Sequence, residues 1–153
     1  MRLIVNGHEH DLPVESELTL QALLRERLRL IGTSLLCDRG ECGACTVLLD
    51  GEPIYSCLSL AVACDGAQIT TLEGIGPAGT RHPLQEAFIA HGVALCGNCM
   101  PGRILAGFAL LAANPSPSDG EIVEGMSGNL CDCDAYPNII AAIRSAAVAM
   151  RAG

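Results

Sequence analysis

Eight of the nine cysteines fall into two groups of four, and the spacing within each group constrains the fold more than any other feature of this 153-residue chain. The first group follows the pattern C-x4-C-x2-C-x11-C, and the second follows C-x2-C-x31-C-x-C. The first spacing is typical of four thiolates that hold one 2Fe–2S cluster. Two quartets therefore predict two 2Fe–2S clusters, with ligands Cys37, Cys42, Cys45 and Cys57 for the first cluster and Cys96, Cys99, Cys131 and Cys133 for the second.

Two other uses of the cysteines remain open from spacing alone. A zinc site is compatible with the first quartet, because C-x4-C-x2-C with a distant fourth cysteine can hold that ion. Disulfides are the second alternative, but the odd number of cysteines and the absence of a secretory signal at Met1–His8 argue against them. We therefore expect a reducing compartment, the cytoplasm, although export together with a partner subunit stays open.

Composition excludes several classes of protein. Half of the residues are hydrophobic, yet the chain has no Trp, two Phe and two Tyr, so the core must consist of aliphatic side chains. The formal charge of −8 becomes more negative when thiolates ligate iron, which disfavours nucleic acid and anionic membranes as partners. No apolar run reaches the length of about 18 residues needed to span a bilayer, so we expect no membrane insertion.

The first half of the chain alternates between strand and helix patterns. Asn6-Gly7 and Asp50-Gly51 are typical of tight hairpin turns. A helix over 20–30 is predicted from its apolar periodicity, with Thr19 as cap and Gly32 beyond its end. The predicted strands cover residues 2–5, 9–12, 46–49, 53–56 and 69–72.

The second half has helical patterns only. A Gly- and Pro-rich stretch over 73–80 marks the linker, and we place the domain boundary between residues 76 and 77. Pro residues, capping residues and a capping box at Ser118 and Glu121 delimit four short helices that suggest a small bundle. The predicted helices cover residues 83–90, 101–113, 119–126 and 137–150.

Each quartet has local chemistry suited to an anionic cluster. Gly40 and Gly43 allow the first cysteine loop to adopt positive φ angles, so that backbone N–H groups can point at the sulfur atoms. Both cysteine pairs of the second quartet precede predicted helices, whose free N–H groups and dipole favour negative charge. Two one-electron carriers indicate electron transfer.

Several motifs together resemble one family, the iron–sulfur subunits of molybdenum hydroxylases, which is the xanthine oxidase family with its separate-subunit aldehyde, carbon monoxide and N-heterocycle dehydrogenases. The resemblance covers about residues 2–147. The motifs are Cys37-Asp38-x-Gly40-x-Cys42-Gly43-x-Cys45-Thr46-Val47, Ser56-Cys57, Thr71-x-Glu73-Gly74, Cys96-Gly97-x-Cys99-x-Pro101-Gly102 and Gly128-Asn129-Leu130-Cys131-x-Cys133.

This resemblance implies an α+β chain, with an N-terminal β-grasp ferredoxin-like domain over 1–76 and a C-terminal four-helix bundle domain over 77–153 that binds the second cluster. It also implies a large partner subunit that carries a molybdopterin cofactor. A flavin (FAD) subunit or another carrier would accept the electrons. The helical cluster would lie near the pterin and the ferredoxin-like cluster farther out. Catalysis would occur on the partner, so no residue of this chain is expected to act as an acid, base or nucleophile.

The chain departs from the family pattern around the second quartet. Leu95 stands where the family usually has a Gln that contacts the pterin, and Asn98 replaces the usual Tyr. Asp132 replaces an Arg, and Asp134-Ala135 replaces Thr-Gly. Ionised carboxylates beside a cluster lower its reduction potential, whereas drift at a surface covered by the partner is the alternative explanation.

The remaining candidates have structural interpretations. Cys64 is expected to be a free thiol in or near the core, and the histidines are expected at the surface or at helix caps. The arginines at 25, 27 and 29 are expected on a solvated helix face, with docking as the alternative. A free ferredoxin-type shuttle remains the alternative function, and a redox sensor or zinc-stabilised module is a third. The sequence does not name the substrate, because the substrate pocket would lie on another chain.

Overall fold

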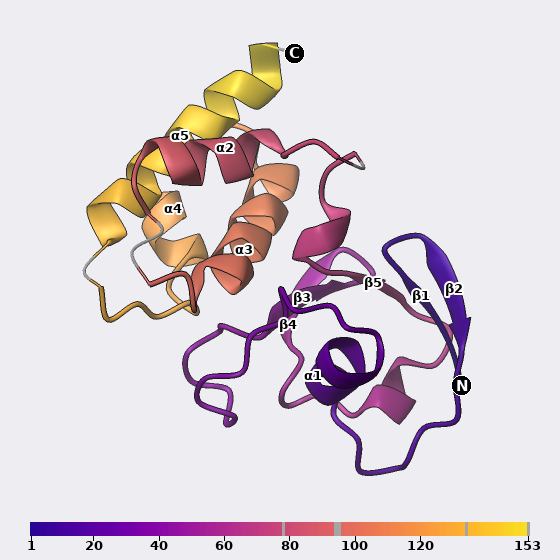
Figure 1. Cartoon of the computed structure of the whole chain (residues 1–153). Coiled ribbons are helices and arrows are strands. Elements are labelled where there is room, and N and C mark those ends of the chain that lie inside the picture. Colours follow the sequence, from indigo (N-terminus) through magenta and orange to yellow (C-terminus); the bar gives the residue numbers. More distant parts are fainter. Residues whose placement is uncertain (78, 94–95, 134, 153) are drawn as a thin grey trace.

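The computed structural model describes residues 1–77, 79–93, 96–133 and 135–152 of the chain. It has an α+β architecture, in which a mixed sheet with short helical turns occupies one half and four helices occupy the other (Figure 1). None of the described helices is long and apolar enough to cross a membrane.

Five short strands form one mixed sheet in the order β2-β1-β5-β3-β4. The β1–β2 and β3–β4 pairs are the two predicted hairpins, and positive φ angles at Asn6, Gly7, Asp50 and Gly51 confirm their tight turns. The β1–β5 pair is parallel and brings the first strand beside the last. The strands are β1 (Arg2–Val5), β2 (His8–Asp11), β3 (Thr46–Leu49), β4 (Glu52–Tyr55) and β5 (Gln68–Thr70).

The predicted helix over 20–30 is much shorter than its periodicity indicated. One α-helical turn, α1 (Leu20–Ala22), capped by the Thr19 hydroxyl as expected, continues into the π-helical turn η1 (Leu23–Arg27). Arg29 then adopts a left-handed conformation with φ 60°, and Ile31 is 72% exposed instead of lying on the buried side. Long-range contacts replace the helix, since the Gln21 side chain donates to the Thr33 carbonyl and that of Arg25 to the Ile31 carbonyl.

Two short 3₁₀ turns complete the sheet half. They are η2 (Ala61–Cys64) and η3 (Leu72–Gly74), which replaces the end of the strand predicted over 69–72.

The helical half confirms the helix positions predicted from Pro and capping residues. His82 accepts a hydrogen bond from the Leu84 N–H and forms a capping box with Gln85. Burial lowers the pKa of His82, which keeps the capping nitrogen unprotonated and able to accept. Ser118 and Glu121 form the second capping box, as expected. The helices are α2 (Pro83–Ala90), α3 (Met100–Ala113), α4 (Asp119–Gly125) and α5 (Tyr136–Ala152).

Two hydrophobic clusters form the core, and neither depends on large aromatic surfaces. The cluster of the sheet half packs Leu20, Leu23 and Leu24 against the strands. The cluster of the helical half surrounds Phe88 and extends to Leu48 on β3, because α3 packs across the sheet. The domain boundary between residues 76 and 77 stays a prediction.

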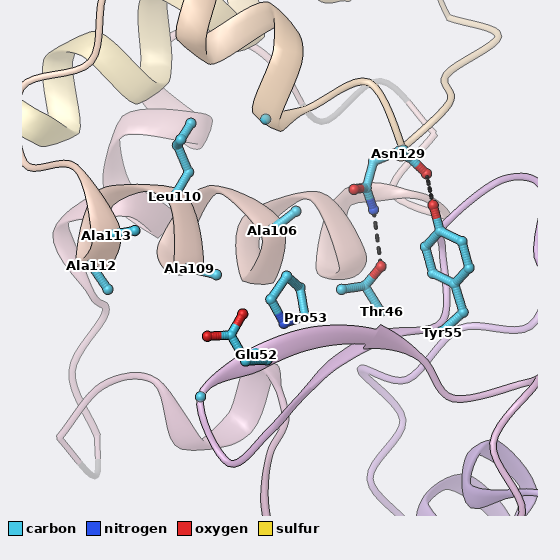
Figure 2. Close-up of a pocket in the computed structure, with 13 residues that line it drawn as sticks. Thr46, Glu52, Pro53, Tyr55, Ala106, Ala109, Leu110, Ala112, Ala113 and Asn129 are labelled. Carbon is cyan, nitrogen blue, oxygen red and sulfur yellow. Dashed lines mark hydrogen bonds between the residues drawn. The ribbon is translucent and has the colours of Figure 1, made fainter.

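Polar contacts connect α3, the sheet and the segment 128–130. A groove of about 590 Å³ lies between β4 and α3. Figure 2 shows its lining residues, with Tyr55 and Asn129 at one end. The Tyr55 hydroxyl donates to the Gly128 carbonyl at 2.7 Å, and the Asn129 amide donates to Gly43 and Thr46. Among the described residues that line this groove there is no cysteine.

Candidate iron–sulfur sites

Three cysteines of the first quartet, Cys37, Cys42 and Cys45, lie on a tightly wound loop between η1 and β3, and Cys57 follows β4. Gly40 and Gly43 both have φ 72°, which confirms the positive angles predicted for the wrapping of this loop. Gly43 must also be small, because a Cβ atom there would lie 2.4 Å from the Gly128 carbonyl oxygen. The glycines therefore serve both the loop and its close approach to the helical half.

Backbone N–H groups point at the sulfur atoms of this loop, as the sequence indicated. Cys37 Sγ accepts hydrogen bonds from the N–H groups of Glu41 and Cys42, each at 3.4 Å, and Cys42 Sγ accepts one from Ala44 at 3.5 Å. Backbone N–H donors, with that of Arg39 the strongest, lower the pKa of Cys37 to about 6. These donors stabilise the thiolate, the form of cysteine that binds metal.

The thiols of the first quartet lie in two pairs. The Cys42 thiol contributes to the pKa shift of Cys37, and the Cys45 thiol contributes to that of Cys57. Burial, together with the nearby Cys45, raises the pKa of Cys57 to about 11. Burial and the surrounding thiolates also raise the pKa of Tyr55, which places that ring beside the quartet.

The second quartet lies at the start of two helices. Cys99 is the residue that precedes α3, and Cys133 lies just before α5. This placement confirms the expectation that both cysteine pairs lie near helix N-termini, where N–H groups favour negative charge.

The second quartet is also paired, Cys96 with Cys133 and Cys99 with Cys131. The backbone N–H of Asn98, and then the Cys133 thiol, lower the pKa of Cys96. The hydrogen bond to Cys96 raises the pKa of Cys133.

The other pair of this quartet differs in burial. Burial raises the pKa of Cys99 to about 11, although Arg103 opposes the shift. Burial by itself would raise the pKa of Cys131. Hydrogen bonds from the Cys133 backbone and the Cys99 thiol outweigh burial and lower this pKa. The paired thiols and their N–H donors fit an anionic metal cluster.

Pairing suits a two-iron cluster, since each iron of a 2Fe–2S cluster takes two thiolates while bridging sulfides complete its coordination. Among the described residues, no three His, Cys, Asp or Glu side chains converge tightly enough to hold a single metal ion. Two thiols for each of two irons is a less demanding arrangement than four donors around one ion, and both quartets supply it.

Both quartets border one cleft of about 470 Å³. Cys37 and Cys42 line one wall, and all four cysteines of the second quartet line the other. A backbone hydrogen bond joins the walls, because the N–H of Leu130, the residue before Cys131, donates to the Cys42 carbonyl at 2.9 Å. This hydrogen bond connects the cysteine-bearing segments of the two quartets.

Arg103 is a site residue that the sequence analysis missed. Its side chain is only 1% exposed and lines the same narrow cavity as the four thiols of the second quartet. One charged residue within the otherwise apolar sequence of α3, MPGRILAGFALLAA, is the signal that could have drawn attention to it.

The residues that depart from the family pattern differ in their location and exposure. Asn98 and Asp132 are exposed and line the cleft between the quartets. Leu95 and Asp134 lie outside the described residues. Ala135 is buried in the helical core.

The remaining candidates are Cys64, which lies where the sequence indicated, and the arginines of the first helix, which make contacts within the chain. Cys64 is buried in the core of the sheet half, as expected, and burial raises the pKa of its thiol. Arg25 and Arg27 are exposed, and both make contacts within the chain. Arg25 donates a hydrogen bond to the Ile31 carbonyl, and Arg27 forms an ion pair with Glu15.

Family comparisons match both halves of the chain. Residues 3–70 match the family described as "2Fe-2S iron-sulfur cluster binding domain". Residues 71–144 match the family described as "[2Fe-2S] binding domain". Both descriptions favour iron–sulfur clusters over zinc at the two quartets.

Curated relatives are similar over nearly the whole chain. The aldehyde oxidoreductase iron–sulfur-binding subunit PaoA of Escherichia coli is 45% identical, over 96% of this chain and 71% of its own length. The nicotine 6-hydroxylase small subunit of Paenarthrobacter nicotinovorans is 44% identical, over 93% of this chain and 86% of its own. The nicotinate dehydrogenase small FeS subunit of Eubacterium barkeri is also 44% identical, over 95% and 93%.

Solved structures share the fold. Quinoline 2-oxidoreductase from Pseudomonas putida 86 contains a chain that superposes with a TM-score of 0.94 at 42% identity, with 100% of this chain and 97% of that one covered. Aldehyde oxidoreductase from Desulfovibrio gigas gives a TM-score of 0.94 at 38% identity, with 99% of this chain matching 17% of that longer polypeptide.

Proposed function

We propose that this chain, which belongs to the family of iron–sulfur small subunits of molybdenum hydroxylases, carries two 2Fe–2S clusters and passes electrons from a molybdenum site on a larger partner to an acceptor. One observation carries this proposal: two cysteines of the first quartet and all four of the second line a single cleft, and the hydrogen bond between Leu130 and Cys42 joins the two segments. Two one-electron sites in contact through a few covalent bonds and one hydrogen bond form a relay.

We assign the ligands pair by pair. Cys37 and Cys42 would bind one iron of the first cluster, and Cys45 and Cys57 would bind the other. In the second cluster the pairs would be Cys96 with Cys133 and Cys99 with Cys131. When bound, a 2Fe–2S cluster supplies reversible one-electron chemistry. The chain's own part is to hold four thiolates, to donate N–H groups toward their charge and to limit the access of water.

The finer architecture supports the same assignment and stays a proposal. We divide the chain into a β-grasp ferredoxin-like domain over 1–76 and a four-helix bundle domain over 77–153. The helical quartet would face the molybdopterin, and the ferredoxin-like quartet would face a flavin subunit or another acceptor. Cysteines that ligate metal instead of forming disulfides suit a reducing compartment such as the cytoplasm.

The surface around the cleft supports a large partner. Leu36 and Leu130 line the cleft and are 51% and 49% exposed, and Leu58, beside Gly40, is 63% exposed. Apolar side chains concentrated beside redox sites are typical of a surface that another subunit covers. The relatives named above act on aldehydes, nicotine and nicotinate, so an aldehyde or an N-heterocycle is the substrate class that we propose for the complex.

Co-purification tests the subunit assignment. The chain, tagged at its C-terminus and expressed from its native genomic locus, is expected to elute with a larger chain and with molybdenum in about equal molar amount. Leu36→Asp and Leu130→Asp should each weaken this assembly, because a carboxylate at a dry interface is left without a partner. Val123→Asp is the control, since Val123 is 55% exposed on α4.

A free shuttle would behave differently. It would elute alone with full iron content, and the three Asp variants would be indistinguishable from the native chain. That result would contradict the subunit assignment and would leave the two cluster sites in place.

A further inference from the structure

Arg103 combines full burial with incomplete pairing. The side chain projects from the first turns of α3, four residues after Cys99, and its backbone N–H donates to the Cys99 carbonyl. It is the largest of the fully buried side chains described, at 1% exposure. A guanidinium in such a position is costly unless every N–H finds an acceptor or an anion lies close by.

The described contacts satisfy only part of the guanidinium. One Nη2–H donates to the Asn129 carbonyl, and the group lies over the Tyr136 ring with Cζ 4.9 Å from the ring centroid. Nε and Nη1 are buried and have no hydrogen-bond partner within the described ranges. No Asp or Glu among those residues forms an ion pair with Arg103. Among the residues that the structure describes, several donors and a full positive charge therefore lack a counterpart.

The surroundings of Arg103 indicate what that counterpart is. The side chain lines one narrow cavity with Cys96, Cys99, Cys131 and Cys133. A cluster with four thiolate ligands is anionic in both redox states, so it would supply the missing negative charge.

We propose that Arg103 is the built-in counter-charge of the helical cluster, a positioning residue that raises the reduction potential of this cluster selectively. Reduction adds one electron and no positive charge to the site. A fixed buried cation therefore stabilises the reduced form more than the oxidised form. The effect should be local, because the ferredoxin-like quartet lies across the cleft and Arg103 lines only the cavity of the helical quartet.

A second charge beside the same cluster should act in the opposite direction and more weakly. Asp132 lies between two ligands of the helical quartet, but it is exposed to solvent. Water and salt screen an exposed carboxylate far more than they screen a buried guanidinium. The buried cation should therefore dominate over the exposed anion in setting the potential.

The test is an EPR-monitored redox titration of the purified complex that contains the full chain. Arg103→Met removes the charge, and Arg103→Lys keeps it on a flexible stem. Arg144→Gln is the control, because Arg144 is an exposed arginine that pairs with Asp119 on the same helical half. Arg103→Met is expected to shift the helical cluster to a more negative potential, Arg103→Lys to retain most of the native value, and Asp132→Asn to shift the potential slightly upward.

The outcomes separate this inference from the cluster assignment on which it rests. Loss of the helical signal in Arg103→Met with retention in Arg103→Lys would also support the counter-charge, because the cluster would then need the charge to stay bound. Equal shifts in the Met and Lys variants, loss of the cluster in both, or unchanged potentials would overturn it. If the native complex itself lacks the helical signal, the proposed function fails instead.

Discussion

At the scale of single residues, the cysteines of one quartet differ widely in pKa because their surroundings differ. The pKa of Cys37 is about 6 under backbone N–H donors, and the pKa of the more buried Cys57 is about 11. Cys57 must therefore release its proton when it binds iron at neutral pH, whereas Cys37 is already largely a thiolate. Loading of the ferredoxin-like site should become more favourable as the pH rises toward the pKa of Cys57.

Cys57→Ser provides a residue-level test of the ligand assignment. It should remove the ferredoxin-like cluster and leave the helical cluster intact, because the two quartets are contributed by different elements. The measurement is visible circular dichroism together with EPR of the reduced complex. Cys64→Ser is the matched control, since Cys64 is equally buried but lies in the apolar core of the sheet half. Loss of a cluster signal in the Cys64 variant would contradict the assignment.

The cysteines of the two quartets could be predicted from residue spacing, because ligands of one cluster recur at short intervals along the chain. Cys64 was expected in or near the core because it follows an apolar run, and it lies in the core of the sheet half. Arg103 escaped this reasoning, since its significance comes from burial and from the unpaired Nε and Nη1. Neither property is encoded at a fixed distance from the cysteines.

At the scale of elements, the short segment 128–130 fastens the helical half to the first cysteine loop. Asn129 donates to the Gly43 carbonyl at 2.8 Å and to the Thr46 hydroxyl at 3.1 Å, and its own carbonyl accepts from Arg103. The next residue, Leu130, donates to the Cys42 carbonyl. One buried amide therefore supports the connection between the two sites.

Asn129→Ala should loosen this connection. It removes the two buried hydrogen bonds of the Asn129 amide, while the Gly43 carbonyl keeps those from the Thr46 N–H and hydroxyl. The loss of two such bonds costs about 1–3 kcal/mol, or roughly tenfold in a local opening equilibrium. Amide hydrogen exchange at Leu130 should accelerate by about this factor. Asn138→Ala, at an exposed position of α5, is the control and should not change it. Unaltered exchange at Leu130 in the Asn129 variant would show that the amide does not hold the segment.

Elements with strong local signals were predictable from the sequence. Asn6-Gly7 and Asp50-Gly51 specify their hairpins through positive φ angles, and the capping box of Ser118 and Glu121 begins α4. The helix predicted over 20–30 is wrong beyond residue 27, because side-chain hydrogen bonds to the carbonyls of the following segment 31–33 and a left-handed turn at Arg29 outweigh its periodicity. Local patterns cannot anticipate such contacts.

At the scale of the whole molecule, two small hydrophobic cores support the two halves, and cysteines from both quartets line one cleft. Each core contains few aromatic residues, so bound clusters should add to the stability of both halves. The exposed apolar side chains around the cleft fit a surface that a partner subunit covers. The hydrogen bond between Leu130 and Cys42 fits an electron relay between the two sites. The central claim in this account is that both quartets hold clusters at the same time.

Iron and acid-labile sulfide analysis of the purified complex, combined with EPR during stepwise reduction, tests this claim most directly. The account predicts about four iron atoms and about four sulfides per chain, with two distinct signals of one unpaired electron each. The two signals should differ, because one quartet faces backbone N–H donors of a loop and the other faces Arg103. About two iron atoms per chain with a single signal would contradict the account, since one quartet would then not be a cluster site.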